Sequence, residues 1–289
     1  MSTTANKKYF IEECTEFGSQ FGLEIKEICH DAQSPYQHIA IYDTEHFGKA
    51  MVNDGFFMLT TLDNFFYHEM MSHPILFTHP HPENIAIIGG GDCGVLKEVL
   101  KHDTVKSVCQ VEIDEQVTKL AMTHFPELCV SNDDPRAELR FEDGIQWLAE
   151  REANSLDVII VDSTDELGPA EGLFSAQFYE SCYHALRADG LIIHQSGSPL
   201  YHLESMTYPM QKEMKKAGFQ TCLTLHYPQP CYPSGWWSST MASKDASLKQ
   251  FREADAKNKS FETQYYNEGI HRGAISTPPF MSRILDDEA

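Results

Sequence analysis

Basic side chains are scarce in this chain of 289 residues. It has 22 Lys and Arg against 43 Asp and Glu, which gives a formal net charge of −21. A surface this acidic is repelled by phosphate backbones and by anionic membranes, so nucleic-acid and peripheral-membrane functions are disfavoured. The same imbalance favours a cationic partner or substrate. Hydrophobic residues make up 42% and aromatic residues 11%, which is an ordinary globular composition and argues against disorder.

The 8 cysteines lack the spacing of a zinc site or of a disulfide framework. No C-x-x-C pair occurs, and several cysteines lie in apolar or glycine-rich runs, where a free cysteine acts as a small hydrophobic residue. The sequence also lacks an apolar run of membrane-span length, and Met1 to Phe10 lacks one of signal-peptide length. These absences predict a soluble, cytoplasmic protein of a reducing compartment that holds no metal.

Short strands and closely spaced turns dominate the first third of the sequence. Strand-like runs occur at Leu23–Ile28, Tyr36–Tyr42, Lys49–Val52 and Phe56–Thr60. Between the last two lies Asn53-Asp54-Gly55, a strong hairpin signal. The pattern predicts a small antiparallel β-strand domain at the N-terminus, assigned to residues 1–70.

Strands alternate with helices in the remainder, residues 71–289. A helical pattern over Asp63–Ser72 is expected to end or kink at His73-Pro74. The strands expected after it are Ile85–Ile88, Val108–Ile113, Leu139–Phe141, Asp157–Val161 and Leu191–Ile193, with helical segments between them. This alternation predicts βαβ units in a doubly wound parallel sheet.

A glycine-rich turn follows the first of these strands. Gly89 to Gly94 fits G-x-G-x-x-G, and its glycines, Gly89 and Gly91 among them, would let the backbone approach a nucleotide. Glu112 ends the next strand, where a carboxylate can accept the ribose hydroxyls, and Asp143 follows the third, within reach of an adenine amino group. The alternative for both carboxylates is a solvated strand end.

The turn contains no Lys or Arg, and Asp92 stands where a diphosphate would approach. Carboxylate and phosphate repel, so an S-adenosyl compound is favoured over a dinucleotide. The segment Asp162 to Glu171, after the fourth strand, is rich in carboxylates. A solvated loop is the usual interpretation of such a run, but at the ligand-binding edge of the sheet it would form with Asp92 an anionic cavity for ammonium groups.

The sequence Gly89–Val99 closely resembles the signature of the polyamine aminopropyltransferases, the spermidine and spermine synthases, and is most similar to spermidine synthase. The resemblance extends over nearly the whole chain through Tyr67–Met71, Val111–Asp114, Asp143-Gly144, Asp162–Phe174 and Tyr232–Gly235. It implies a small N-terminal antiparallel β domain on a Rossmann-like catalytic domain of the class I methyltransferase type, assembled as a homodimer or homotetramer.

The resemblance also implies a reaction and a set of site residues. In the family, the aminopropyl group of decarboxylated S-adenosylmethionine, a co-substrate rather than a cofactor, passes to a polyamine and leaves 5′-methylthioadenosine. By motif position the nucleoside would be held by Gln37, Glu112, Asp143, Gly144 and Pro169. The amine would be held by Tyr67, His68, Asp92, Asp162, Ser163, Thr164, Asp165 and Tyr232. Asp162 would be the catalytic base, in contact with the attacking nitrogen alone, while other carboxylates bind the spectator ammonium groups.

Two departures from the family pattern concern the acceptor. Met58 stands where glutamine is usual, and Glu166 where proline is usual. Putrescine is the expected acceptor, with cadaverine, agmatine or spermidine as alternatives. A class I methyltransferase, a dinucleotide oxidoreductase and a polyamine-binding relative without turnover remain as rival functions. His73, His79 and His81 are interpreted as a surface connector rather than a zinc site, because no acidic or cysteine partner is suitably spaced.

Overall fold

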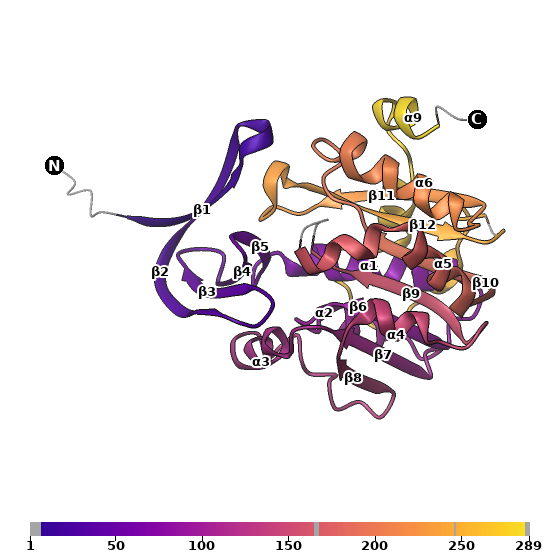
Figure 1. Cartoon of the computed structure of the whole chain (residues 1–289), viewed down its shortest axis with the longest axis horizontal. Helices are drawn as coiled ribbons and strands as arrows, with labels where there is room; N and C mark the ends of the chain where they lie inside the picture. The colour runs from indigo at the N-terminus through magenta and orange to yellow at the C-terminus, as the bar shows by residue number, and fades with distance from the viewer. Residues whose placement is uncertain (1–6, 165–167, 246, 287–289) are drawn as a thin grey trace.

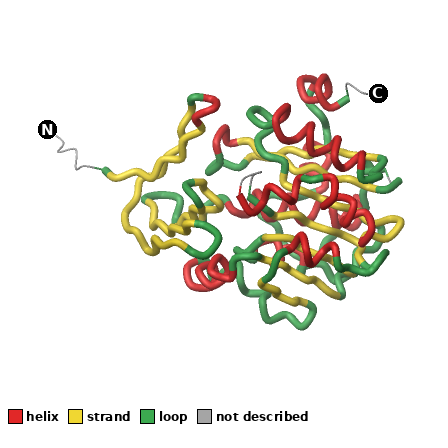
Figure 2. The backbone as a smooth tube through the Cα atoms, in the orientation of Figure 1, coloured by secondary structure: helices red, strands yellow, loops and turns green. Residues whose placement is uncertain are grey.

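The computed structural model describes residues 7–164, 168–245 and 247–286. It contains two β-sheets, one of five strands in the order β1-β2-β3-β4-β5 and one of seven in the order β11-β12-β10-β9-β6-β7-β8. Figure 1 shows the smaller, N-terminal sheet to one side of the larger, central sheet. In Figure 2 the strands of the central sheet lie between helices on both sides. The predicted combination of an antiparallel N-terminal sheet and a Rossmann-like sheet is confirmed.

The N-terminal sheet is an antiparallel meander. Its strands are β1 (Lys8–Cys14), β2 (Ser19–Gln33), β3 (His38–Thr44), β4 (Lys49–Asn53) and β5 (Phe56–Thr60). Asp54 and Gly55 both have positive φ, at 48° and 93°, so the tight turn forms where the sequence predicted it. One face of β3 and β4 packs through Ile39 and Met51 against helix α3 (Glu115–His124) of the other domain. This contact fixes the N-terminal sheet against the central one.

Helix α1 (Asn64–Thr78) connects the two sheets and runs past the proline that was expected to end or kink it. Pro74 lies inside the helix, and every residue from Tyr67 to Phe77 is buried. Proline removes one backbone hydrogen bond from a helix interior, but α1 packs against helix α2 (Gly94–Val99) and strands of the central sheet. Of the two expected outcomes at His73-Pro74, an end or a kink, the end is wrong, because this tertiary packing outweighs the local preference. The proposed domain limit after residue 70 falls inside α1.

Five neighbouring strands of the central sheet are parallel, as predicted. They are β10 (Leu186–Gln195), β9 (Leu156–Asp162), β6 (Asn84–Gly89), β7 (Ser107–Glu112) and β8 (Ala137–Phe141). Alternate residues of β6 face opposite layers: Ile85 and Ile87 pack with α1 and α2, whereas Ala86 and Ile88 pack on the other face. That second layer contains α4 (Gly144–Ala149), α5 (Ala176–Ala185) and α6 (Tyr208–Lys216).

The sheet is completed by an antiparallel pair that the sequence pattern did not indicate. Strands β11 (Thr221–Pro228) and β12 (Trp236–Ser243) extend it beyond β10. Short helical turns occur at η1 (Thr15–Phe17), η2 (Gly168–Phe174), η3 (Leu203–Thr207) and η4 (Pro233–Gly235), and the chain ends with α7 (Glu253–Lys257), α8 (Glu268–Ala274) and α9 (Pro279–Leu285). No helix within the described residues is long and apolar enough to cross a membrane.

The structure corrects the expectation that His73, His79 and His81 form a surface connector. His73 and His79 are buried, at 0% and 1% exposure, and only the side chain of His81 is largely exposed. His73 Nδ1 lies 3.0 Å from His102 Nε2, and its Nε2 lies 3.1 Å from a carboxylate oxygen of Glu98. These partners come from α2 and the turn after it. The spacing within the histidine-rich segment therefore could not reveal them.

Candidate active site

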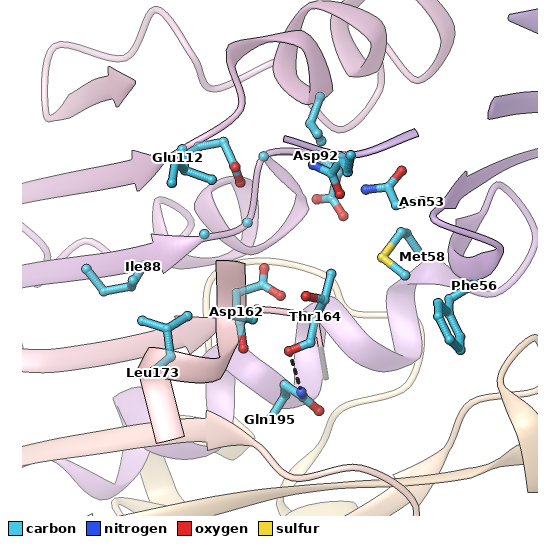
Figure 3. Close-up of a pocket in the computed structure, with 18 of the residues that line it drawn as sticks. Asn53, Phe56, Met58, Ile88, Asp92, Glu112, Asp162, Thr164, Leu173 and Gln195 are labelled. Atoms are coloured by element: carbon cyan, nitrogen blue, oxygen red, sulfur yellow. Dashed lines mark hydrogen bonds between the residues drawn. The ribbon is translucent and has the colours of Figure 1, made fainter. Parts of the chain in front are cut away.

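A cavity of about 300 Å³ opens between the N-terminal sheet and the carboxyl ends of the central strands. One wall is the turn that joins β4 to β5, and the other is made by residues that follow β6, β7, β8 and β9. Figure 3 shows Asp162 and Thr164 on one side of this space, with Asp92, Asn53 and Met58 on the other. Ligands bind at this edge of doubly wound sheets because the strand-to-helix loops diverge there.

The glycine turn after β6 has the tight shape that a ligand-binding loop needs. Gly89 has φ of +84°, and a Cβ at this position would lie 2.2 Å from the carbonyl oxygen of Asp162. A Cβ on Gly91 would lie 2.8 Å from Oε2 of Glu112. Gly89 requires glycine, because its φ is positive and a side chain would clash with the backbone at the end of β9, whereas a side chain at Gly91 would displace the side chains of Glu112 and Val117. The turn thereby brings its own backbone, Glu112 and Asp162 around one space.

Glu112 is buried at the end of β7 and lines the cavity. Its Oε1 accepts a hydrogen bond of 2.9 Å from the backbone N–H of Asp114. Burial raises the pKa of Glu112 to about 7, against the lowering effect of the backbone donors. Hydroxyl donors from a bound ribose would favour its ionised form.

Gln37 reaches the cavity through a link between the two domains. It follows β2, and its Nε2 donates a hydrogen bond of 3.1 Å to Oδ2 of Asp114, which also accepts from Ser34 Oγ at 2.6 Å. Asp114 is 1% exposed, and its Oδ1 caps α3 by accepting from the backbone N–H of Gln116. The carboxylate of Asp114 therefore sets where Gln37 lies against the cavity.

Asp143 and Gly144 line the cavity at the end of β8. The Oδ1 of Asp143 accepts a hydrogen bond of 2.8 Å from the backbone N–H of Ile145, so this carboxylate is the N-cap of α4. The cap holds the side chain at the mouth of the cavity. Pro169 belongs to η2, but its side chain lies outside the described residues; Ala170 and Leu173 of the same turn line the cavity.

The two carboxylate oxygens of Asp162, at the end of β9, have different surroundings. Tyr67 Oη donates a hydrogen bond of 2.7 Å to its Oδ1, whereas its buried Oδ2 accepts none from the described residues. Burial, together with the negative charge of Asp92, raises the pKa of Asp162 to about 7. A carboxylate that lines a cavity, has this pKa and keeps one oxygen free of hydrogen bonds within the described residues is suited to accept a proton near neutral pH.

Asp92 lies across the cavity from Asp162, and its carboxylate contacts two groups that do not line the cavity. Its Oδ1 accepts a hydrogen bond of 2.6 Å from the backbone N–H of Gly94, and its Oδ2 lies 3.2 Å from His68 Nε2. Burial lowers the pKa of His68, but Asp92 more than compensates, and the net shift is upward. His68 contacts Asp92 and is absent from the described cavity lining, so the structure does not bring it to the ligand space.

The remaining predicted amine contacts lie at the same end of the cavity. Ser163 and Thr164 continue from Asp162, and the backbone carbonyl of Thr164 accepts a hydrogen bond of 3.1 Å from Gln195 Nε2 (Figure 3). Tyr232 also lines the cavity, and its hydroxyl donates a hydrogen bond of 2.5 Å to the carbonyl of Met58. Asp165 lies outside the described residues.

Several cavity residues were not singled out as ligand contacts from the sequence: Asn53, Phe56, Gln195 and Trp237. Gln195 ends a parallel strand, β10, and its position at the carboxyl edge could have identified it. The others come from the β4–β5 turn and from β12, whose approach to the cavity depends on how the two sheets pack. Met58, noted only as a departure from the family pattern, also lines this wall.

The cavity is strongly anionic. Its described lining contains no Lys, Arg or His, but it contains the carboxylates of Glu12, Asp54, Asp92, Glu112, Asp143 and Asp162. In a partly enclosed space, charges of one sign raise the local concentration of ligands of opposite charge. The arrangement therefore suits a positively charged ligand and disfavours phosphates.

Comparison with known proteins gives the family of the chain. Residues 64–252 match the spermine/spermidine synthase domain, and residues 8–61 match the spermidine synthase tetramerisation domain. The chain is 58% identical over 275 residues to the polyamine aminopropyltransferase of Nitrosococcus oceani, covering 95% of this chain and 96% of the relative. It is 54% identical over 288 residues to that of Xanthomonas campestris pv. campestris, covering 99% and 100%.

Two solved structures have the same fold over almost their full length. A spermidine synthase in complex with the transition-state analogue AdoDATO superposes with a TM-score of 0.93 at 33% identity, covering 98% of this chain and 96% of that one. The spermidine synthase from Thermotoga maritima gives 0.91 at 33% identity, covering 98% and 95%. From sequence and fold together, the chain belongs to the spermine/spermidine synthase family of polyamine aminopropyltransferases, enzymes that transfer aminopropyl groups.

Proposed function

We propose that the chain is a cytoplasmic spermidine synthase, which transfers the aminopropyl group of decarboxylated S-adenosylmethionine to putrescine and releases 5′-methylthioadenosine. The observation that carries the proposal is the anionic cavity, in which Asp92 and Asp162 face a space lined by no described cationic side chain. Both substrates are cations, one a sulfonium with an ammonium and the other a diammonium. Putrescine is the acceptor that yields spermidine, the product in the names of both solved relatives.

The nucleoside half of the donor fits the glycine-turn end of the cavity. Glu112 would accept the ribose hydroxyls, and the exposed carboxylate of Asp143 would accept the adenine amino group. Gln37, Gly89, Gly91, Gly144 and Pro169 would complete this half. The sulfonium would then lie between this end and Asp162, with the aminopropyl chain directed toward the β4–β5 turn. No resident cofactor or metal has a role in this scheme, because the sulfonium is already an excellent leaving group.

The acceptor amine would occupy the space beside Asp162. At pH 7 an alkylammonium with a pKa near 10.4 costs about 4–5 kcal/mol to deprotonate. The carboxylate of Asp162 would accept that proton as the nitrogen attacks the methylene in line with the C–S bond. Asp92 would bind the distal ammonium, and Tyr67, Ser163, Thr164, Asp165 and Tyr232 would surround the chain between the two ends. His68 would act through Asp92.

A homotetramer is the assembly we propose, with a homodimer as the alternative. The support is the match of residues 8–61 to a tetramerisation domain and the apolar side chains exposed on the N-terminal strands. Tyr9, Ile11 and Ile28 are about half exposed, at 50%, 47% and 52%. Exposed apolar side chains on one sheet are a feature of protein interfaces. Sedimentation equilibrium of the purified protein separates a tetramer from a dimer or a monomer.

The function is tested by incubating the purified protein with decarboxylated S-adenosylmethionine and, separately, putrescine, cadaverine, agmatine and spermidine. Mass spectrometry of the products should show spermidine and 5′-methylthioadenosine, with the highest kcat/KM for putrescine. Turnover should be lost in Asp162→Asn and kept in Asp103→Asn, an exposed carboxylate outside the cavity. Higher kcat/KM for another amine would overturn the choice of acceptor. Near-normal turnover of Asp162→Asn would overturn the role of the base.

A further inference from the structure

Asn53 lines the active-site cavity and carries an amide oxygen that the fold does not pair. It ends β4, where it lies opposite Ile39 of β3 and Phe56 of β5, so its backbone is fixed from both sides. Its side chain is 5% exposed, and its Oδ1 is buried without a hydrogen-bond partner among the described residues. Buried polar atoms in folded proteins are nearly always hydrogen-bonded, so this acceptor calls for a donor that a ligand can supply.

The turn after β4 does not require an asparagine at position 53. Asp54 and Gly55 have positive φ, whereas Asn53 is not among the described residues in that conformation. The carboxylate of Asp54 accepts a hydrogen bond of 2.8 Å from the backbone N–H of His38, and the N–H of Asp54 donates one of 2.8 Å to the carbonyl of His38. Asp54 and Gly55 therefore make the hairpin turn. Asparagine is depleted in strands, so position 53 carries its amide against the local preference.

The amide of Asn53 is on the wall of the cavity that has lost another amide. Asn53 lies on the same side as Asp92 and Met58, opposite Asp162 and Thr164 (Figure 3). Met58 stands where the family pattern has a glutamine, and a thioether is only a weak hydrogen-bond acceptor. Asn53 thus supplies on this wall the neutral amide that position 58 lacks.

We propose that Asn53 binds the terminal ammonium of the donor's aminopropyl group. The inference rests on the proposed function, in which the aminopropyl chain of decarboxylated S-adenosylmethionine is directed toward the β4–β5 turn. Asn53 is the residue of β4 that borders this turn. An ammonium has three N–H donors and no acceptor, so one can pair with the amide oxygen while the others pair with carboxylates of the cavity.

This contact would position the donor without taking part in the bond changes. The C–S bond breaks, and the new C–N bond forms, at the other end of the propyl chain. Holding the ammonium fixes that chain, so that the methylene beside the sulfonium lies in line with the attacking nitrogen. The product 5′-methylthioadenosine lacks the aminopropyl group. Asn53 would therefore stabilise the complex with the donor and leave binding of this product unchanged.

The test compares the binding of decarboxylated S-adenosylmethionine and of 5′-methylthioadenosine by isothermal titration calorimetry, in the unaltered protein and in Asn53→Leu. Leucine has nearly the shape of asparagine but no hydrogen-bonding group. The dissociation constant of the donor should rise roughly ten- to a hundredfold, as expected for the loss of one hydrogen bond to a charged group. The dissociation constant of 5′-methylthioadenosine and the amine KM should not change.

Two further variants separate the contact from a structural effect. Asn53→Asp keeps an acceptor oxygen and should keep tight binding of the donor. Asn258→Leu makes the same change as Asn53→Leu at an exposed position outside the described cavity lining, and both nucleosides should bind it as they bind the unaltered protein.

Unchanged binding of the donor to Asn53→Leu would overturn the inference, and so would an equal loss of affinity for both nucleosides. A higher amine KM with unchanged donor binding would also overturn it, because the contact would then belong to the acceptor. The calorimetry needs no acceptor amine and no turnover. Absence of aminopropyl transfer by the unaltered protein would instead overturn the proposed function, so the two failures are distinguishable.

Discussion

The hydroxyl of Tyr67 donates a 2.7 Å hydrogen bond to Oδ1 of Asp162, while Oδ2 of the same carboxylate has no partner among the described residues. Tyr67 is on α1 and Asp162 ends β9, so the contact joins the helix between the two sheets to the central strand of the site. Tyr67 therefore fixes the orientation of a carboxylate whose second oxygen is buried and keeps its capacity to accept a proton.

Removal of that hydrogen bond should shift the pH dependence of turnover. Tyr67 stabilises the ionised form of Asp162 and so lowers a pKa that burial and Asp92 raise to about 7. In Tyr67→Phe the pKa of Asp162 should therefore rise further. Since the base acts as the carboxylate, the acidic limb of the kcat profile should move to higher pH, with partial recovery in alkaline buffer. A profile that keeps its acidic limb, or moves it to lower pH, would contradict the assignment.

The opposite shift is expected from Asp92→Asn. The negative charge of Asp92 raises the pKa of Asp162, so its removal should lower that pKa and move the acidic limb to lower pH. The same substitution removes the proposed partner of the distal ammonium, so the amine KM should rise by roughly ten- to a hundredfold. Both quantities come from pH-dependent steady-state kinetics. Asp103→Asn is the matched control, and an unchanged amine KM in Asp92→Asn would exclude the binding role.

Met58 should influence the length of the amine that is accepted. It lines the cavity with a thioether where the family pattern has an amide, so this wall would suit the methylene groups of an amine better than its ammonium groups. Met58→Ala would enlarge the space and favour cadaverine over putrescine by roughly tenfold in kcat/KM, since one methylene in an apolar pocket is worth about 1–3 kcal/mol. The hydrogen bond from Tyr232 should persist in this variant, because its acceptor is the backbone carbonyl of Met58. Competition assays with both diamines measure the ratio, and an unchanged ratio would place Met58 away from the amine.

The site residues that the sequence pattern predicted are those whose position is set by a single strand. Glu112, Asp143 and Asp162 each follow a parallel strand, and parallel strands bring their carboxyl ends to one edge whatever else the chain does. The glycine turn is equally local. The motif resemblance added Gln37 and Tyr67, which no strand pattern could assign. The roles of all these residues stay predictions.

The parts that the sequence did not predict depend on packing between distant segments. Asn53 and Phe56 reach the cavity only because α3 docks the N-terminal sheet over it. His68 sits behind Asp92, a direction that helical spacing does not determine. Pro74 is tolerated within α1 for the same reason, since burial of the helix is set by elements remote in sequence.

Among the polar side chains, Glu69 should make one of the largest contributions to the free energy of unfolding. This residue of α1 is 1% exposed, and its carboxylate accepts hydrogen bonds from three successive backbone N–H groups, of Gln264, Tyr265 and Tyr266, at 2.7–2.9 Å. In Glu69→Ala these donors lose their acceptor, with an expected loss of about 3–5 kcal/mol. Differential scanning calorimetry should show a thermal midpoint lower by roughly 5–10 °C. Glu262→Gln, at an exposed position nearby, should leave the midpoint unchanged; equal midpoints for both variants would refute the role of Glu69.

Ionisation of Asp162 should lower the free energy of unfolding at alkaline pH, although the same carboxylate is the proposed base. Its folded-state pKa of about 7 exceeds the ordinary value of 3.8, so the folded protein binds more protons than the unfolded chain between these two values. Stability linked to this group is therefore fully present below pH 3.8 and falls as the pH rises through 7. Asn cannot ionise, so at pH 8 Asp162→Asn should be more stable than the unaltered protein by about 2–4 kcal/mol. The gain should shrink at pH 5, where Asp162 is largely protonated in the folded state.

Thermal midpoints of both proteins at the two pH values test this, with Asp103→Asn as the control. A gain of the same size at both pH values would mean that ionisation of Asp162 is not its source.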